Sequence, residues 1–146
     1  MIYHNTTNCR CSTSPYAQGL ELTSVNVGAQ SLTATVTATP ADCAGHFPGY
    51  PALPVAVLGT AMADATSRLI EATTHRPMMR WVPKGRLVFE AHRFVQAGTP
   101  VDIDARIVSS AGPRRTILVN ASAGEQVAAS LSINVVTVHP EMLTPR

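Results

Sequence analysis

The stretch PVAVLGTAMADATSRLIEAT, residues 54–73, decides the fold. Its apolar side chains recur at three- and four-residue intervals, the spacing of one face of an α-helix. Pro54 suits the first turn, where its missing N–H costs no hydrogen bond. At about 1.5 Å per residue the predicted helix is about 30 Å long. Because it is largely apolar and rich in small residues, we expect a sheet to enclose it. The apolar positions are Val57, Leu58, Ala61, Met62, Ala65 and Leu69.

The sequence on both sides of this helix predicts β-strands. Residues 32–39 alternate apolar and hydroxylated side chains, which is the period of a half-buried strand. A strand-like pattern already begins at Leu20, and residues 40–54, rich in Pro and Gly, are expected to form a loop. After the helix, turn residues separate four further segments. These four strands are expected near residues 86–94, 101–109, 115–122 and 127–138.

Two strands, one helix and four strands predict an α+β fold. One helix cannot cover both faces of a six-stranded sheet. An antiparallel sheet wrapped round the helix, with its open side covered by a second copy, solves that burial problem. A length of 146 residues suits one compact domain. We expect residues 1–16, which lack periodicity, to form an N-terminal arm or tail, and residues 17–146 to form a single domain.

Composition excludes several classes of protein. Hydrophobic residues make up 45% and charged residues 14%, as in globular proteins. A net charge of +2 with scattered basic residues does not favour nucleic acid as a partner. No apolar run reaches the roughly 18 residues of a membrane span. The N-terminus lacks the pattern of a secretory signal, so a cytoplasmic protein is expected. Cys9 and Cys11 have the wrong spacing for zinc, and no metal site is predicted.

The segment GHFPGYPALP, residues 45–54, is the candidate for chemistry. His46, flanked by Gly and Pro, precedes the start of the helix, where unpaired N–H groups and a partial positive charge are expected. An imidazole beside such donors suits proton abstraction α to a carbonyl, because the N–H groups can hold the developing enolate oxygen. The structural alternative is a loop histidine whose nitrogens are satisfied by hydrogen bonds.

This segment resembles the signature of the β-hydroxyacyl-acyl-carrier-protein dehydratases of fatty-acid synthesis. The match continues with Ala61, Met62 and Ala63, and weaker similarity covers roughly residues 30–138. The resemblance implies a hotdog fold, in which an antiparallel curved sheet wraps round one long central helix. It also implies a dimer with active-site tunnels along the interface. No metal or organic cofactor is needed, because the acyl chain arrives on the phosphopantetheine of acyl carrier protein.

The resemblance also implies roles for single residues. His46 acts as the base on the α-carbon of a 3-hydroxyacyl thioester. Backbone N–H groups at the helix start polarise the thioester carbonyl. The expected substrate-binding residues are Gly45, Phe47, Pro54, Val55 and Thr60.

Two of these positions depart from the family. Thr60 stands fourteen positions after His46, where the family has an acid, and a hydroxyl is far too weak an acid to replace it. Val55 stands where the family has Gly. Asp64, one helical turn beyond Thr60, is the candidate catalytic acid of this chain. The structural alternative is an i,i+4 ion pair between Asp64 and Arg68.

These residues support three functional hypotheses. The first is a lyase that dehydrates 3-hydroxyacyl thioesters bound to acyl carrier protein, in fatty-acid or polyketide biosynthesis. It would work as a homodimer, or as a heterodimer whose other hotdog subunit supplies the acid. The second is a hotdog thioesterase in which Asp64 directs water at the thioester. The third is a non-catalytic acyl-binding or stabilising hotdog subunit.

Two other basic features have simpler interpretations. His92 lies in a predicted strand beside Arg93 and is expected to be exposed. Arg114 and Arg115 form the one adjacent basic pair in the chain, which predicts a solvated pair. Contact with an acidic carrier protein is the alternative for this pair.

Overall fold

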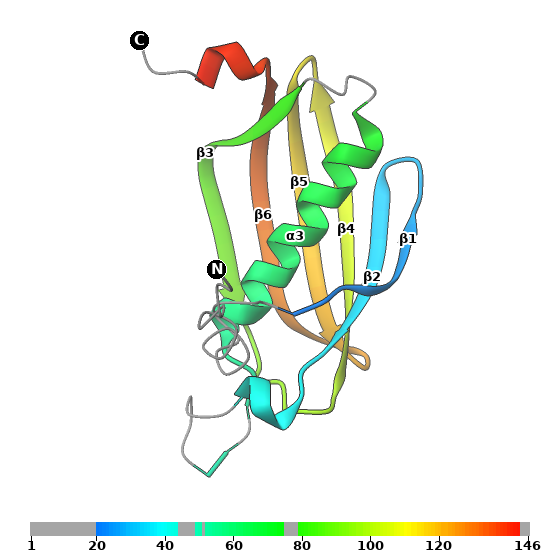
Figure 1. The fold of residues 1–146 in the computed structure, drawn as a ribbon, viewed down its shortest axis with the longest axis vertical. Helices are drawn as coiled ribbons and strands as arrows, with labels where there is room; N and C mark the ends of the chain where they lie inside the picture. The colour runs from blue at the N-terminus through cyan, green and yellow to red at the C-terminus, as the bar shows by residue number, and fades with distance from the viewer. Residues whose placement is uncertain (1–19, 44–48, 51, 75–78, 144–146) are drawn as a thin grey trace, which may run out of the picture.

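The computed structural model describes residues 20–43, 49–50, 52–74 and 79–143. It confirms the predicted order of two strands, one long helix and four strands. The predicted arm, residues 1–16, lies outside the described residues. Figure 1 shows the helix lying across one face of the sheet. The elements are β1 (Thr23–Val27), β2 (Ser31–Thr37), η1 (Pro40–Cys43), α3 (Val55–Thr73), β3 (Arg80–Ala91), β4 (Pro100–Ala111), β5 (Arg114–Ala123), β6 (Gln126–Val138) and η2 (Pro140–Leu143).

The six strands form one antiparallel sheet in the order β1-β2-β4-β5-β6-β3. The strands on either side of α3 in the sequence, β2 and β3, therefore lie on opposite sides of β4, β5 and β6. The chain crosses the sheet through α3, which packs against all five of these strands. This crossing places the start of α3 near one end of the sheet and its last turn near the other (Figure 1).

The core lies between α3 and the face of the sheet that we call the inner face. Every apolar helix position predicted from the sequence is buried. Along β4, the side chains of Val101, Ile103 and Ala105 are buried, whereas the alternate side chains are not. Thr66 is a fully buried polar residue, and its hydroxyl donates to the Met62 carbonyl at 3.0 Å. Among the described residues, no helix combines the length and apolarity needed to cross a membrane.

One predicted strand boundary was wrong. The strand expected near residues 86–94 begins at Arg80, because β3 tolerates Pro83 and Gly85. The pairing of β3 with β6 shifts register between Pro83 and Leu87, and Gly85 adopts a φ of +77° within this irregular stretch. Residues 40–54, which were expected to form a loop, contain the short 3₁₀ turn η1. A hydrogen bond between Thr39 and Asp42 stabilises this turn. The backbone N–H of Thr39 donates to the Asp42 carboxylate at 2.7 Å.

The predicted solvated arginine pair is wrong for one of its members. Arg115 is half-buried, and its Nη1 donates to the hydroxyls of Thr73 and Thr74 at 3.1 and 3.3 Å. These hydroxyls lie at the carboxyl end of α3, where a cation is favourable. Arg114 is exposed, as expected.

We predict that Leu69→Ala lowers the free energy of unfolding by about 2–5 kcal/mol, because Leu69 is fully buried and truncation leaves a cavity. Urea denaturation measures the change. Glu71→Ala, an exposed position on the same helix, is the matched control and is expected to change the free energy by about 0.5 kcal/mol or less. Equal effects of the two substitutions would contradict the described packing of α3.

Candidate functional site

The first turn of α3 contains no acidic side chain that could neutralise the partial positive charge of the helix start. Pro54 is the N-cap residue, with an extended backbone and no side-chain capping hydrogen bond. The first turn of the helix carries no acidic residue. The N–H groups of Val57 and Leu58 donate to the Pro54 carbonyl at 3.0 and 3.2 Å. The helix start therefore keeps its partial positive charge, which suits a developing oxyanion.

Residues 44–48 and 51, which include Gly45, His46 and Phe47, lie outside the described residues. The roles predicted for these three residues therefore stay predictions. The chain on both sides is anchored in the core. Cys43 is buried before the segment and Ala52 after it. The backbone N–H of Leu53 donates to the Val95 carbonyl at 2.7 Å. This hydrogen bond joins the chain just before α3 to the connection between β3 and β4.

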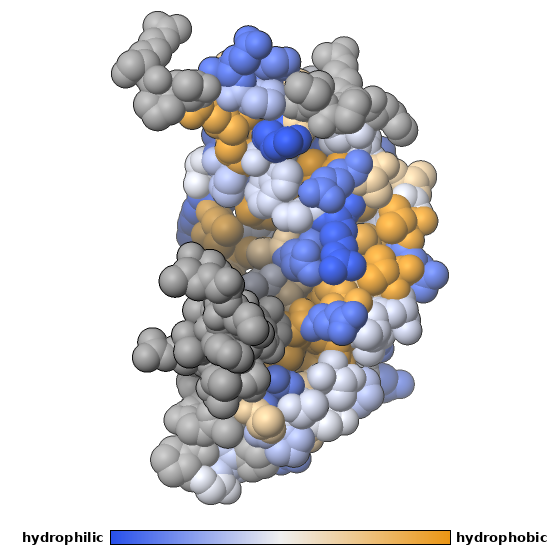
Figure 2. Space-filling model, viewed as in Figure 1, coloured by the Kyte–Doolittle hydropathy of each residue, from blue (hydrophilic) through white to orange (hydrophobic). Residues whose placement is uncertain are grey.

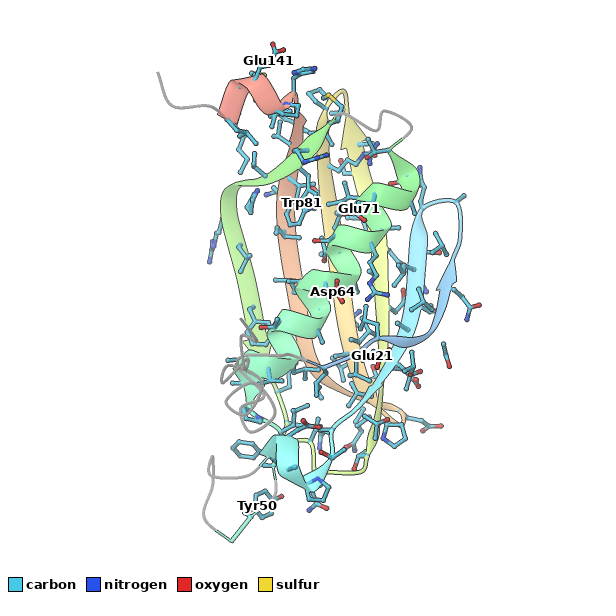
Figure 3. The ribbon with its side chains drawn as sticks, in the orientation of Figure 1. Glu21, Tyr50, Asp64, Glu71, Trp81 and Glu141 are labelled. Carbon is cyan, nitrogen blue, oxygen red and sulfur yellow. The ribbon has the colours of Figure 1, made fainter. Side chains whose placement is uncertain are left out.

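The side of α3 that faces away from the sheet carries a polar stripe. Thr60 is exposed, and its hydroxyl donates to the Ala56 carbonyl of the preceding turn at 3.0 Å. Figure 3 shows Asp64 and Glu71 further along the same side of the helix. Figure 2 shows a band of hydrophilic side chains along this side, with hydrophobic patches beside it. The polar stripe is thus the part of α3 that the sheet leaves uncovered.

Asp64 and Arg68 form the ion pair that their spacing predicts. The Nη2 of Arg68 lies 3.2 Å from Oδ2 of Asp64, and its Nε donates to Oδ1 at 3.4 Å. The side chains of Arg68 and Asp64 are 43% and 42% exposed. The guanidinium thus restrains the carboxylate but leaves it accessible. Pairing and a catalytic role are therefore compatible.

Two other side-chain groups are not supported as catalytic candidates. His92 is exposed, as predicted, and its Nε2 lies 3.0 Å from the Ser130 hydroxyl and 4.0 Å from the Glu90 carboxylate. In a Ser–His–acid relay the serine and the acid contact different ring nitrogens, whereas here both contact one. Burial raises the pKa of the Cys43 thiol, and Asp42 adds to the rise. A raised pKa makes Cys43 a poor nucleophile at neutral pH.

No group of His, Cys, Asp and Glu in the described part of the chain is clustered closely enough to hold a metal ion. The candidate site therefore consists of two parts: the helix start at Val55 and the polar stripe centred on Asp64. Val55 is half-buried, with its backbone N–H at the first position of the helix. A rise of about 1.5 Å per residue separates Val55 from Asp64 by about 13 Å along the axis.

No family model and no curated protein matches the chain. Solved structures do match its fold. Protein TT0310 from Thermus thermophilus is similar with a TM-score of 0.66 at 14% identity, over 84% of this chain and 94% of that one. Thioesterase HI1161 from Haemophilus influenzae is similar with a TM-score of 0.67 at 13% identity, over 95% and 92%. The chain has the hotdog fold. The fold predicted from the sequence is thus confirmed.

A further hotdog neighbour is the fluoroacetyl-CoA thioesterase FlK, with a TM-score of 0.64 at 18% identity, over 81% of this chain and 91% of that one. Identities this low establish the fold and nothing finer. The narrower resemblance to dehydratases receives no specific support from these neighbours, since two of the three are thioesterases.

We predict that Asp64→Asn changes the free energy of unfolding by about 0.5 kcal/mol or less. Both partners of the ion pair are substantially exposed, and exposed i,i+4 pairs contribute little. Urea denaturation of the purified variant measures this change. A loss above about 2 kcal/mol would show that Asp64 has a structural role beyond the pair with Arg68.

Proposed function

We propose that this protein hydrolyses acyl thioesters, with Asp64 as the carboxylate that directs the attacking water. One observation carries the proposal: Asp64 lies in the middle of the uncovered side of α3, accessible and restrained by Arg68. The hotdog neighbours named as thioesterases support the same reaction class. We therefore favour hydrolysis, the second hypothesis from the sequence, over dehydration, the first.

The reaction needs an electrophile, a base and a leaving group. Backbone N–H groups at the helix start, Val55 among them, polarise the thioester carbonyl. The Asp64 carboxylate accepts a proton from water as the oxygen attacks the carbonyl carbon. The C–S bond then breaks, and the leaving thiolate takes the proton that Asp64 accepted, which gives a carboxylic acid and a free thiol and returns Asp64 to its carboxylate form. Arg68 is a positioning residue, because it limits the rotamers of Asp64.

One subunit cannot apply both parts of the site to one thioester, since about 13 Å of helix separates Val55 from Asp64. We therefore propose a dimer in which the helix start of one subunit lies against the polar stripe of the other. A homodimer suffices for hydrolysis, because the chain itself carries Asp64.

The edge strand β3 is the proposed contact between subunits. Among the described strands its one neighbour is β6, so no described strand pairs with the other edge of β3 over residues 81–91. Leu87, in this strand, is 51% exposed. The opposite edge, β1, is less suitable for pairing. It has five residues, an interrupted register and a positive φ at Ser24.

The proposed substrate is an acyl group on phosphopantetheine. Coenzyme A and acyl carrier protein present the same arm and the same thioester, so each is a candidate carrier. FlK, the hotdog neighbour whose substrate is named, acts on fluoroacetyl-CoA. Substrates of graded chain length on both carriers distinguish the acyl group and its carrier.

We predict that Asp64→Asn lowers kcat for thioester hydrolysis by about a hundredfold or more, since loss of a general base costs this much. Release of free thiol from acyl-CoA and acyl-carrier-protein substrates of graded chain length provides the measurement. Glu71→Gln, on the same side of the helix, is the matched control and is expected to keep full activity. Absence of thiol release from every substrate, or an unaffected Asp64→Asn variant, would overturn the proposal.

Dehydration of 3-hydroxyacyl thioesters is the second candidate, favoured by the motif at residues 45–54. In the heterodimeric form of this hypothesis a different hotdog subunit supplies the acid, because the exposed Thr60 hydroxyl cannot act as one. In that case His46→Ala abolishes formation of the 2-enoyl product by the mixed dimer, whereas Asp64→Asn does not. Absorbance of the conjugated double bond measures the product. Acyl-chain binding without either reaction, unchanged by His46→Ala, would instead indicate a non-catalytic subunit.

A further inference from the structure

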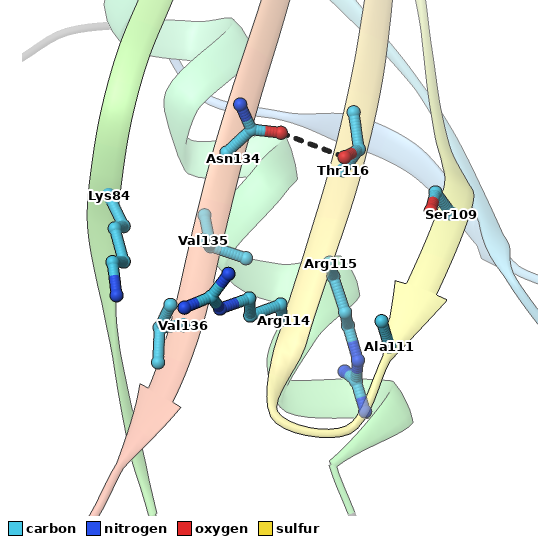
Figure 4. A pocket seen from close by; sticks show the side chains of 9 residues that line it. All are labelled: Lys84, Ser109, Ala111, Arg114, Arg115, Thr116, Asn134, Val135 and Val136. Carbon is cyan, nitrogen blue, oxygen red and sulfur yellow. Dashed lines mark hydrogen bonds between the residues drawn. The ribbon is translucent and has the colours of Figure 1, made fainter.

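A hollow of about 320 Å³ lies near the turn between β4 and β5, on the face of the sheet that points away from α3, here called the outer face (Figure 4). One row of paired residues on its floor joins Ser109, Thr116 and Asn134 across β4, β5 and β6. Arg114 lies in the next row, and Lys84, from β3, lies at the remaining side of the hollow. Four strands therefore contribute side chains to one concave surface.

The hollow gathers positive charge that no carboxylate balances. Its described lining includes Lys84 and Arg114, both exposed, and no acidic residue. Neither side chain forms an ion pair or a side-chain hydrogen bond with a described residue. By contrast, Arg68 and Arg106 each pair with a carboxylate, at 3.2 and 2.8 Å. Because like charges repel, the two unmatched cations favour an anion from outside the chain.

An irregular stretch of β3 determines where Lys84 lies. The pairing of β3 with β6 is interrupted after Pro83, and residues 84–86 stand opposite the single residue Asn134. Within this bulge Gly85 has a φ of +77°, and no heavy atom lies within 4 Å of the place that a Cβ would take. The backbone conformation therefore favours glycine here, and lack of space does not. Since bulges redirect side chains, this one places Lys84 at the hollow.

Neutral hydrogen-bond donors lie beside the two cations. The Thr116 hydroxyl donates to Oδ1 of Asn134 at 2.8 Å (Figure 4). This hydrogen bond orients the amide of Asn134, so its Nδ2 remains a donor at the hollow. The Ser109 hydroxyl lies in the same row. Cations together with neutral donors suit an anion that has many acceptor oxygens, because each group can donate to a different oxygen.

The spacing of the cations favours a diphosphate over a single phosphate. Lys84 and Arg114 come from β3 and β5, which lie on either side of β6, so their backbones are about 10 Å apart. A guanidinium can hold one phosphate through two parallel hydrogen bonds, and an ammonium can hold the next as a point charge. A volume of about 320 Å³ is at the lower end of the range for small-molecule sites, which favours a compact ligand.

We propose that this hollow is a binding site for a diphosphate group, held between the guanidinium of Arg114 and the ammonium of Lys84. Asn134 and Ser109 donate to its remaining oxygens. Free diphosphate and the diphosphate of a small organic ester present the same oxygens, so each is a candidate source. The site goes beyond the proposed function and does not depend on it, because α3, which carries Asp64, lies on the other side of the sheet (Figure 1).

Isothermal titration calorimetry of the whole chain with pyrophosphate, adenosine diphosphate and orthophosphate tests the site. We expect one pyrophosphate per chain, bound at least about tenfold more tightly than orthophosphate, because it reaches both cations. Lys84→Gln and Arg114→Gln should each lower the association constant about tenfold or more, as expected for loss of a hydrogen bond to a charged group. Arg106→Gln is the matched control. It removes the same charge from the outer face and is expected to leave binding unchanged.

The stability of the ligand-free variants shows whether the two cations have a structural role. Lys84→Gln/Arg114→Gln should unfold at or above the Tm of the wild-type protein, since it removes two unmatched like charges. A Tm several degrees lower would mean that these side chains stabilise the fold, and would overturn the assignment to a ligand.

Three binding results would also overturn the proposal. The first is the absence of binding of both pyrophosphate and adenosine diphosphate. The second is equal weakening by Arg106→Gln and Lys84→Gln, which would mean attraction to general surface charge. The third is tighter binding of a polyglutamate peptide than of either diphosphate, which would assign the hollow to an acidic protein. If the diphosphates bind as expected, the tighter of the two identifies the source as free or esterified.

Discussion

The structure depends on the burial of one face of α3 against the inner face of the sheet. Val57, Met62 and Leu69 fill the space between them, and the sheet contributes Ile103, Val119 and Leu131 from alternate positions of its strands. Each such side chain contributes roughly 1.5–3 kcal/mol on burial. A single helix can satisfy one face of a sheet and no more. Among the described residues, the arrangement therefore leaves three surfaces without a covering helix or strand: the polar stripe of the helix, the face of the sheet that points away from α3, and the edge of β3.

The proposed hydrolysis depends on the side of α3 that the sheet leaves uncovered. The helix start and Asp64 lie on one helix, about 13 Å apart along its axis, so the proposed reaction requires a second subunit to bring both to one substrate.

The position of the acidic side chain along the polar stripe distinguishes the two candidate reactions, dehydration and hydrolysis. A carboxylic acid at Thr60 would suit loss of a hydroxyl as water, as in the dehydratases that residues 45–54 resemble. A carboxylate one turn later, at Asp64, suits the activation of water for hydrolysis. The fold does not choose between them, since chemistry depends on which groups are placed on the scaffold. Here the accessible carboxylate at Asp64 favours hydrolysis.

The sequence by itself determined the helix, its buried face, the order of the elements and the Asp64–Arg68 pair. Each of these depends on spacing within a few residues, so local periodicity suffices to predict them. Tertiary structure decided what depends on distant strands. The early start of β3 at Arg80 is possible because pairing with β6 outweighs the local effect of Pro83. Arg115 contacts Thr73 and Thr74 at the end of α3, whereas its neighbour Arg114 stays exposed. Lys84 and Arg114 line one hollow because β6 pairs with both β3 and β5, which no local pattern encodes.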